Sequence, residues 1–260
     1  MDYSEESLIE EIKNKKELRG ISPKLIKDIL LEKLKNKGKN LSQFINFSKF
    51  DKKIIIKEVR AELRLLHGRF NSHIEKRNEK KSLTIDEILE THNSTKERLA
   101  DYNLIKDLIK KLNPKSILDL GCGLNPLAIL DTIKSITYYA SDINENDLAL
   151  IDKYFKINNI EGKTFFYDLR KINSEKLPSA DLCIIFKVLD IIEKKGHKLA
   201  EQIMLNVDSK YFLISFATRK LSNKPMNRPK RTWFEYLLKR LNYTYEILET
   251  SNEIIYIIKK

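Results

Sequence analysis

The chain has 260 residues, of which 42% are hydrophobic and 33% are charged, enough apolar material for a core and too much for a disordered chain. No stretch approaches the roughly 20 apolar residues of a membrane helix, and residues 1–11 are acidic where a secretory signal is basic, so we expect a cytoplasmic protein with no membrane partner. Two cysteines and four histidines exclude a disulfide framework and a structural zinc site, and we expect no metal.

The net charge of +12 is unevenly distributed along the chain. Residues 11–85 hold 21 Lys and Arg against 9 Asp and Glu, an excess equal to that of the whole protein. A second segment, residues 219–231, has six cations and no acid. A single charge run is usually a solvated face, but two basic segments that flank an acidic remainder indicate a polyanionic partner.

The amino-terminal part has a helical pattern. From Glu6 to about Leu112, apolar residues recur at spacings of three and four, which predicts four to six short helices. Thr84 followed by Glu87 is a capping box, and it predicts a helix over residues 85–91. We therefore expect an all-α basic domain over residues 1–112.

After Asn113 the pattern changes to short β-rich runs separated by segments of helical length. These runs cover residues 116–121, 136–142, 163–168, 181–189 and 211–217. Such alternation predicts an α/β domain with a doubly wound parallel sheet. A helix over 232–241 and an antiparallel hairpin formed by residues 243–249 and 253–259 are expected to complete this domain, residues 113–260.

The turn after the first strand has the most specific local pattern, Asp119-x-Gly121-x-Gly123-x-Asn125. Glycines let a cofactor approach backbone that a Cβ would block, and we expect Asn125 to cap the next helix, with Pro126 in its first position. Asp142 ends the next strand 21 residues after Gly121, where an acid can accept hydrogen bonds from ribose hydroxyls.

The pattern also narrows the choice of cofactor. Asp168 ends the third strand, where it can meet the exocyclic amine of adenine. The third glycine of a dinucleotide fingerprint is absent, which argues against nicotinamide and flavin. The turn resembles the first motif of class I S-adenosylmethionine methyltransferases, and the hairpin resembles their reversed last strand. This resemblance implies S-adenosyl-L-methionine in a Rossmann-like methyltransferase sheet; the alternative is a tight turn in another doubly wound fold.

Two kinds of methyl acceptor can be set aside. Methylation of base amino groups typically needs Asn or Asp, two prolines and an aromatic residue after the fourth strand, and this sequence has none there. Attack on pyrimidine carbon 5 needs a thiolate, but Cys122 lies in the cofactor turn and Cys183 in an apolar strand, where a structural role is expected. A ring nitrogen such as guanine N7 needs no deprotonation, so alignment alone can suffice.

Four segments in order resemble the aminoglycoside-resistance 16S rRNA guanine-N7 methyltransferases: residues 92–99, 117–129, 184–193 and 214–221, the last followed by Met226. Residues 63–70 are similar to a helical stretch of that family's RNA-binding domain, so the resemblance extends from about Val59 to the carboxyl end. It implies direct methyl transfer to N7 of a guanine in ribosomal RNA. The expected partner is the assembled 30S subunit, and the protein is expected to be a monomer.

The resemblance also implies roles for individual residues. Arg98 would hold the methionine carboxylate, with a helix-surface ion pair to Glu97 or Asp101 as the alternative. Phe186, Lys187 and Ser215 would face the target nucleotide, with a solvated lysine as the alternative for Lys187. The expected cofactor contacts are Arg98, Asp119, Gly121, Gly123, Asn125, Asp142, Ile143, Asp168 and Leu169. The expected RNA contacts are Arg60, Arg64, His67, Arg69, Lys76, Arg77, Arg219, Lys220, Lys224, Arg228, Lys230 and Arg231.

The sequence departs from the family pattern beside the acceptor pocket. Ala217 and Asp190 stand where prolines are usual, and residues 222–224 replace a glycine-rich turn. These changes keep cofactor use intact and leave the target nucleotide open. Two other functions remain: a methyltransferase acting on tRNA or another nucleotide, and a non-catalytic RNA-binding assembly factor with the same fold.

Overall fold

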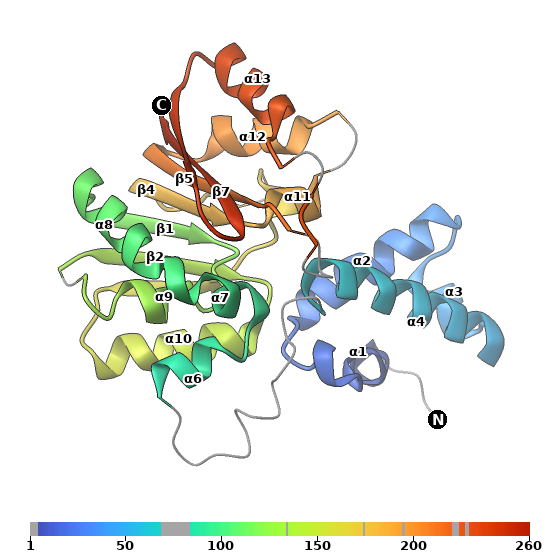
Figure 1. Cartoon of the computed structure of the whole chain (residues 1–260). Helices are drawn as coiled ribbons and strands as arrows, with labels where there is room; N and C mark the ends of the chain where they lie inside the picture. The colour runs from blue at the N-terminus through green and yellow to red at the C-terminus, as the bar shows by residue number, and fades with distance from the viewer. Residues whose placement is uncertain are drawn as a thin grey trace.

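The computed structural model describes residues 5–68, 84–133, 135–173, 175–193, 196–219, 224–226 and 229–260. Its centre is one seven-stranded sheet with the order β3-β2-β1-β4-β5-β7-β6 (Figure 1). The strands are β1 Ser116–Leu120, β2 Thr137–Asp142, β3 Gly162–Phe166, β4 Ala180–Phe186, β5 Ser209–Ala217, β6 Thr244–Glu249 and β7 Glu253–Lys259. Strands β1 to β5 are parallel, and β7 runs antiparallel to β5 and β6. The predicted sheet and terminal hairpin are confirmed.

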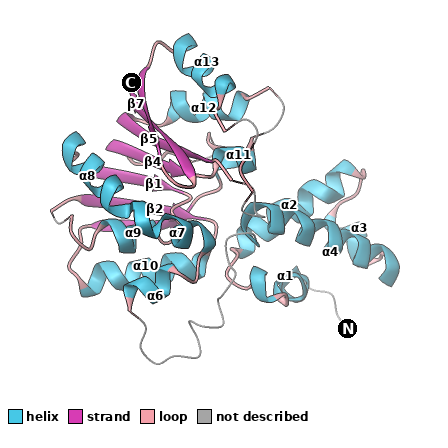
Figure 2. Cartoon of the chain, viewed as in Figure 1, coloured by secondary structure: helices cyan, strands magenta, loops and turns pink. Residues whose placement is uncertain are grey.

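Helices cover both faces of the sheet (Figure 2). One face packs against α6 Ile85–Leu89, α8 Tyr102–Leu112, α9 Asn125–Ile129 and α10 Glu145–Ile157. The other packs against α11 Leu189–Ile192, α12 Lys198–Asn206 and α13 Thr232–Arg240. Side chains alternate along a strand, so in β1 Ile117 faces the first layer while Leu118 and Leu120 face the second. The burial of both faces explains why the parallel strands are almost continuously apolar.

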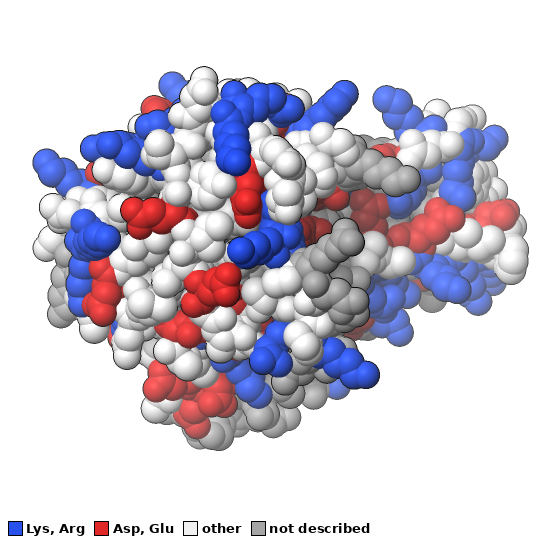
Figure 3. Space-filling model, turned by 45° about the horizontal axis from the view of Figure 1, so that its top comes forward, with Lys and Arg blue, Asp and Glu red and all other residues white. Residues whose placement is uncertain are grey.

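Residues 5–68 form a separate helical lobe with its own apolar core. It contains α1 Glu5–Lys13, η1 Lys16–Leu18, α2 Pro23–Asn36, α3 Leu41–Ile45, α4 Lys49–Leu63 and η2 Arg64–Gly68. Side-chain caps fix the starts of the later helices: Asn40 caps α3 and Ser48 caps α4. In the space-filling view, basic groups are spread over both lobes. On the helical lobe, acidic groups lie among the basic groups (Figure 3).

The division between the lobes differs from the boundary expected at residue 112. The capping box at Thr84 is present, and α6 ends at Leu89. Leu89 of α6 and Ile105 of α8 belong to the same core as the sheet. Residues 84–260 therefore form the sheet lobe, which also contains α7 Asn93–Arg98, η3 Leu99–Asp101 and η4 Leu169–Lys171. Apolar spacing predicts a helix but does not say which neighbour its buried face will contact.

The helical lobe docks where β2 and β3 end. The Ser22 amide donates to the Ile143 carbonyl at 3.1 Å, and the Glu145 amide donates to the Gly20 carbonyl at 2.8 Å. The side chains of Ile143 and Phe166 pack against the core of the helical lobe. The lobe thus forms one wall beside the carboxyl ends of the parallel strands. Within the described ranges, no helix is long and apolar enough to cross a membrane.

Candidate active site

A cleft lies at the carboxyl ends of β1, β2 and β4, where the order of the parallel strands reverses and ligands bind in doubly wound folds. Both lobes contribute to its lining. The helical lobe supplies Leu66 and His67. The sheet lobe supplies His92, Ser94, Thr95, Gly121, Cys122, Gly123, Asn125, Asp142, Ile143, Tyr167, Asp168, Leu169, Phe186, Val188, Ile191 and Ile192.

The glycine turn after β1 forms the floor of this cleft, and both of its glycines are required by the geometry. Gly121 has φ 71° and Gly123 has φ 50°, backbone angles that residues with a side chain rarely adopt. A Cβ on Gly121 would lie 2.6 Å from Cγ2 of Val188, and one on Gly123 would lie 2.9 Å from Cε1 of His92. Neither position can therefore carry a side chain, and the bare backbone that the turn presents in the cleft fits a cofactor that contacts it closely.

Asp142 binds this turn through its carboxylate. Its Oδ2 accepts from the Gly123 amide at 2.9 Å, and its Oδ1 accepts from the Asn144 amide at 2.9 Å. The pKa of Asp142 lies above its ordinary value because the carboxyl group is buried, although the nearby His67 and these two amides act in the opposite direction. A carboxylate has about four acceptor sites, so both oxygens keep capacity for the two hydroxyls of a ribose.

Asp168 also lines the cleft, but it lies two residues beyond the end of β3 and caps η4. Its two oxygens accept from the Arg170 guanidinium at distances of 2.8 to 3.2 Å. The same guanidinium reaches the helical lobe, where Nη1 donates to Oε1 of Glu62 on α4 at 3.0 Å. An adenine amine would therefore meet a carboxylate that is already paired with a cation.

Asp119 lies deeper than expected, and the side chain of Asn125 lines the cleft but is bound within the protein. Asp119 is fully buried behind the turn and does not line the cleft; its Oδ2 accepts from the Tyr138 hydroxyl at 2.8 Å, and burial raises its pKa to about 7. Asn125 is the first residue of α9, and Leu124 occupies the cap position, so the predicted cap was wrong by one residue. The Asn125 side chain instead accepts from Arg98 at 2.7 Å and from the Tyr102 hydroxyl at 2.8 Å.

Arg98 is almost fully buried and its partner is Glu253, not the neighbouring acids that a helix-surface pair would use. Burial raises the pKa of the Glu253 carboxyl, but the charges of Arg98 and Lys187 outweigh this effect, so its pKa lies below the ordinary range. Glu253 is not among the residues that the sequence patterns predict for the site. Its only local signal is that one acid opens an otherwise apolar strand, Glu253–Lys259.

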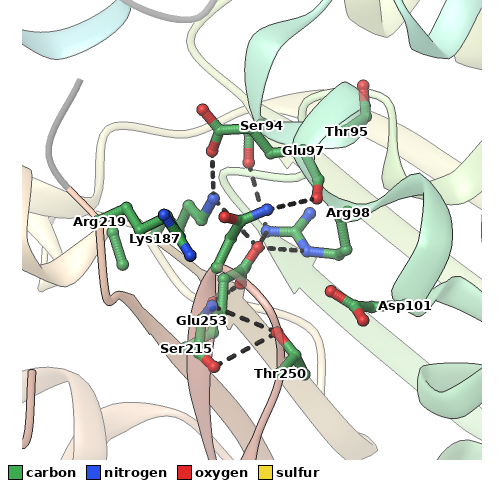
Figure 4. Close-up of polar contacts among 12 residues, drawn as sticks. Ser94, Thr95, Glu97, Arg98, Asp101, Lys187, Ser215, Arg219, Thr250 and Glu253 are labelled. Atoms are coloured by element: carbon green, nitrogen blue, oxygen red, sulfur yellow. Dashed lines mark hydrogen bonds and ion pairs between the residues drawn. The ribbon is translucent and has the colours of Figure 1, made fainter. Parts of the chain in front are cut away.

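Lys187 and Ser215 complete this buried network (Figure 4). Lys187 Nζ lies 2.6 Å from Oε2 of Glu97 and 3.2 Å from Oε1 of Glu253, and the Ser215 hydroxyl donates to Oε2 of Glu253. Lys187 also has φ 59°, a strained conformation for a side-chain-bearing residue. The lysine is thus buried and paired, which contradicts the solvated alternative. Phe186 lines the cleft, with the Arg98 guanidinium 4.6 Å from its ring.

Several of the predicted RNA-binding cations make contacts within the protein. Arg60 donates to the Ile12 carbonyl at 3.3 Å, Arg64 lies 2.7 Å from Glu17, and His67 lies 2.7 Å from Asn144. Arg231 is 9% exposed and pairs with Asp190 through Nη2 at 2.6 Å. Arg219, Lys224 and Lys230 are exposed. Arg69, Lys76, Arg77, Lys220 and Arg228 lie outside the described residues.

The structure supports the expected roles of the two cysteines. Cys122 and Cys183 are buried, and burial raises the pKa of both thiols well above the ordinary value. A thiolate nucleophile is therefore disfavoured. Among the residues that the structure describes, no group of His, Cys, Asp and Glu side chains could hold a metal ion.

The chain is similar to several curated sequences, of which two are described here. A protein of Frankia casuarinae named 16S rRNA (guanine(1405)-N(7))-methyltransferase is 27% identical over 186 residues, which is 68% of this chain. The chain spans 64% of the length of that relative. A protein of Serratia marcescens with the same name is 29% identical over 180 residues, covering 68% of this chain and 70% of the relative.

Solved structures resemble the fold over most or all of the chain. The 16S rRNA methylase RmtB matches with a TM-score of 0.76 at 23% identity, covering 99% of this chain and 98% of that one. The 16S rRNA methylase ArmA matches with a TM-score of 0.56 at 27% identity, covering 71% of this chain and 94% of that one.

A family described as "Ribosomal RNA methyltransferase (FmrO)" matches residues 79–257, which is more than half of the chain and includes the glycine turn, the Arg98 network and the terminal hairpin. The chain therefore belongs to the ribosomal RNA methyltransferase (FmrO) family.

Proposed function

We propose that this protein transfers a methyl group from S-adenosyl-L-methionine to N7 of a guanine in 16S ribosomal RNA. The observation that carries the proposal is the convergence of the glycine turn, Asp142 and Phe186 in the lining of one cleft. The names of the two curated relatives support the choice of RNA and ring position.

The cleft offers a consistent set of contacts for the methyl donor. The bare backbone of Gly121 and Gly123 would pass under the cofactor, and the free acceptor capacity of Asp142 would take the ribose hydroxyls. Ile143 and Leu169 line the same cleft and would contact the adenine ring. When bound, the cofactor supplies an electrophilic methyl group on a sulfonium.

The proposed chemistry needs alignment rather than a base. The guanine N7 lone pair forms the new bond to the methyl carbon while the sulfur–carbon bond breaks, so no proton has to leave the acceptor. Lys187, which follows the cleft residue Phe186, is paired with Glu97 and Glu253, and we propose that this network holds the acceptor side of the site in position. We propose that Phe186 contacts the target base and that Ser215, fully buried, acts through Glu253 as a positioning residue.

We propose the assembled 30S subunit as the substrate. The deep major groove of A-form RNA hides N7, so the enzyme must recognise folded RNA and extrude the base. Arg219, Lys224 and Lys230 follow β5 and are exposed, and we propose that they contact phosphates. We also propose that the protein acts as a monomer, and a ribosomal substrate would place it in the cytoplasm.

Incubation with methyl-labelled S-adenosyl-L-methionine tests this function. We expect label in 16S RNA when 30S subunits are supplied, at N7 of one guanine when the modified position is mapped. Label in tRNA instead would support methyltransferase activity but would contradict 16S RNA as the substrate. RNA binding with no methyl transfer to any RNA would contradict the enzymatic function and favour an assembly factor.

A further inference from the structure

The loop that follows β2 is bound to the helical lobe by backbone contacts around one residue, Asn144. Ile21 of the helical lobe and Asn144 form an antiparallel bridge. The amides of Ser22 and Glu145 make the two hydrogen bonds across it, at 3.1 and 2.8 Å. The Ile21 side chain is fully buried in the core of the helical lobe. The helical lobe therefore holds this loop, although β2 itself belongs to the sheet.

Asn144 is 1% exposed and makes contacts in three directions. Its Oδ1 accepts from the amides of Asn146 and Asp147 at 3.0 and 3.3 Å, and so caps α10. Its Nδ2 lies 2.7 Å from Nε2 of His67 in the helical lobe. Its backbone amide donates to Oδ1 of Asp142 at 2.9 Å. Asn144 thus connects the helical lobe and α10 to the proposed ribose acceptor.

The two lobes fit together at this point without room for one more carbon atom. Gly20 is buried, and a Cβ added to it would overlap Oδ1 of Asn144 and lie 2.9 Å from its Cγ. Gly20 is not among the described residues that line the cleft. A methyl group added at Gly20 would therefore displace the residue that contacts Asp142, without touching a bound cofactor.

The helical lobe also holds Asp168, the other acid expected to meet the cofactor. Arg170 pairs with Asp168 at 2.8 Å and with Glu62 of α4 at 3.0 Å. Ile143 lines the cleft and packs against the core of the helical lobe. The proposed contacts of the cofactor's nucleoside thus depend on where the helical lobe lies.

We propose that Asn144 is a positioning residue for the cofactor, through which the docked helical lobe sets the place of Asp142. This inference rests on the proposed function and deepens it, because it makes the helical lobe a part of the cofactor site. A carboxylate that binds two ribose hydroxyls must be held to within a fraction of an ångström. A contact that only stabilised the fold would change the free energy of unfolding and leave the cofactor affinity of the folded protein unchanged.

The test measures the affinity of the full-length protein for S-adenosyl-L-methionine by titration calorimetry. The variants are Gly20→Ala, Asn144→Ser and the two combined. The matched controls are Gly38→Ala and Asn40→Ser in the same lobe: Gly38 has φ 65° with nothing within 4 Å of an added Cβ, and Asn40 caps α3. We expect Gly20→Ala to weaken binding about tenfold and Asn144→Ser about fivefold, and both controls to stay within about twofold of wild type.

Two further measurements test whether the effect passes through Asn144. Serine is shorter than asparagine, so Asn144→Ser removes the atoms that the added methyl group would meet. The double variant should therefore bind the cofactor no more weakly than Asn144→Ser alone. In methyl transfer to 30S subunits, KM for the cofactor should rise by the same factor as the loss of affinity, while kcat at saturating cofactor changes by less than about twofold.

The outcomes separate this inference from the proposed function. If the wild-type protein methylates 16S RNA while Gly20→Ala and Gly38→Ala bind the cofactor equally, the inference is wrong and the function stands. Additive losses in the double variant, or a fall in kcat with KM unchanged, would also overturn it. If Gly20→Ala does not fold, the comparison of Asn144→Ser with Asn40→Ser decides, and equal affinities overturn the inference. A wild-type protein that binds no cofactor would contradict the inference and the proposed function together.

Discussion

Arg98 and Glu253 are 155 residues apart in the chain, yet they form a buried bidentate pair: Nε lies 2.9 Å from Oε1 and Nη2 lies 3.1 Å from Oε2. The arginine comes from α7 and the acid from the first position of β7, the antiparallel strand. The same carboxylate contacts Lys187. Glu253 therefore connects the terminal hairpin to the proposed cofactor and target positions.

Removing the charge of Glu253 should strongly destabilise the protein. In Glu253→Gln, the buried Arg98 and Lys187 lose their shared counter-charge, and breaking a buried pair costs about 3–5 kcal/mol. Chemical denaturation should show this loss in the free energy of unfolding. Glu249→Gln, at an exposed position on β6, is the control and should change it by less than about 0.5 kcal/mol. Equal stabilities of the two variants would contradict the role of Glu253.

Asp142→Ala should weaken binding of S-adenosyl-L-methionine. The substitution removes the proposed ribose acceptor and leaves the buried Gly123 amide without its partner, which together should cost about 1–3 kcal/mol of binding free energy. Asp152→Ala on α10 is a suitable control, because Asp152 pairs only with exposed Lys156 among the described contacts. Titration calorimetry that finds the same affinity in both variants would refute the assignment of Asp142.

Glu62 should influence cofactor affinity although it does not line the cleft. Arg170 is shared between Asp168 in the cleft and Glu62 of the helical lobe. In Glu62→Gln, Arg170 loses that anchor, so Asp168 is held less firmly, and we expect cofactor binding to weaken by about 0.5–1 kcal/mol. Glu58→Gln, one turn earlier on α4, breaks only the pair with Lys37 and should bind normally. Identical cofactor affinities would show that the lobes are not coupled through Arg170.

Asp119 should make stability depend on pH. Burial raises its pKa from about 3.8 to about 7, so the folded protein binds this proton more tightly than the unfolded chain. The stabilisation from this proton is fully present below about pH 4, the ordinary pKa of the unfolded group, and it is lost as the pH rises through about 7, by an amount on the order of a few kcal/mol. Asp119→Asn should flatten unfolding free energies measured between pH 5 and 8. A steep dependence that persists in this variant, with exposed Asp107→Asn as the control, would contradict the prediction.

The pair of Arg231 and Asp190 should hold the segment after β5 in place. Asp190 stands where the family pattern has proline, and Arg231 contacts both this acid and the Ala217 carbonyl, the latter at 3.1 Å. We expect Asp190→Arg to lower methyl transfer about tenfold, with cofactor affinity retained, and the double variant with Arg231→Asp to recover part of it. Failure of the exchanged pair to recover activity would mean that Arg231 itself contacts RNA.

The sequence by itself determined the features that depend on near neighbours. Alternating β-rich runs predict the parallel sheet, the capping box at Thr84 places the start of α6, and the two glycines with Asp142 locate the cleft. These signals are local because hydrogen-bonded turns, caps and strand periodicity involve residues close in the chain. The hairpin of β6 and β7 is also set by residues that are close in the chain.

Only the tertiary structure decided which charged groups remain available for ligands. It paired Arg98 with Glu253, Asp168 with Arg170 and Arg231 with Asp190, and it left Lys49, Lys53 and Lys57 of α4 exposed. A basic residue is identical in sequence whether it binds RNA or closes an internal ion pair. The difference arises from long-range packing, because burial and an opposite charge supplied by a distant segment set the cost of leaving a charge unpaired.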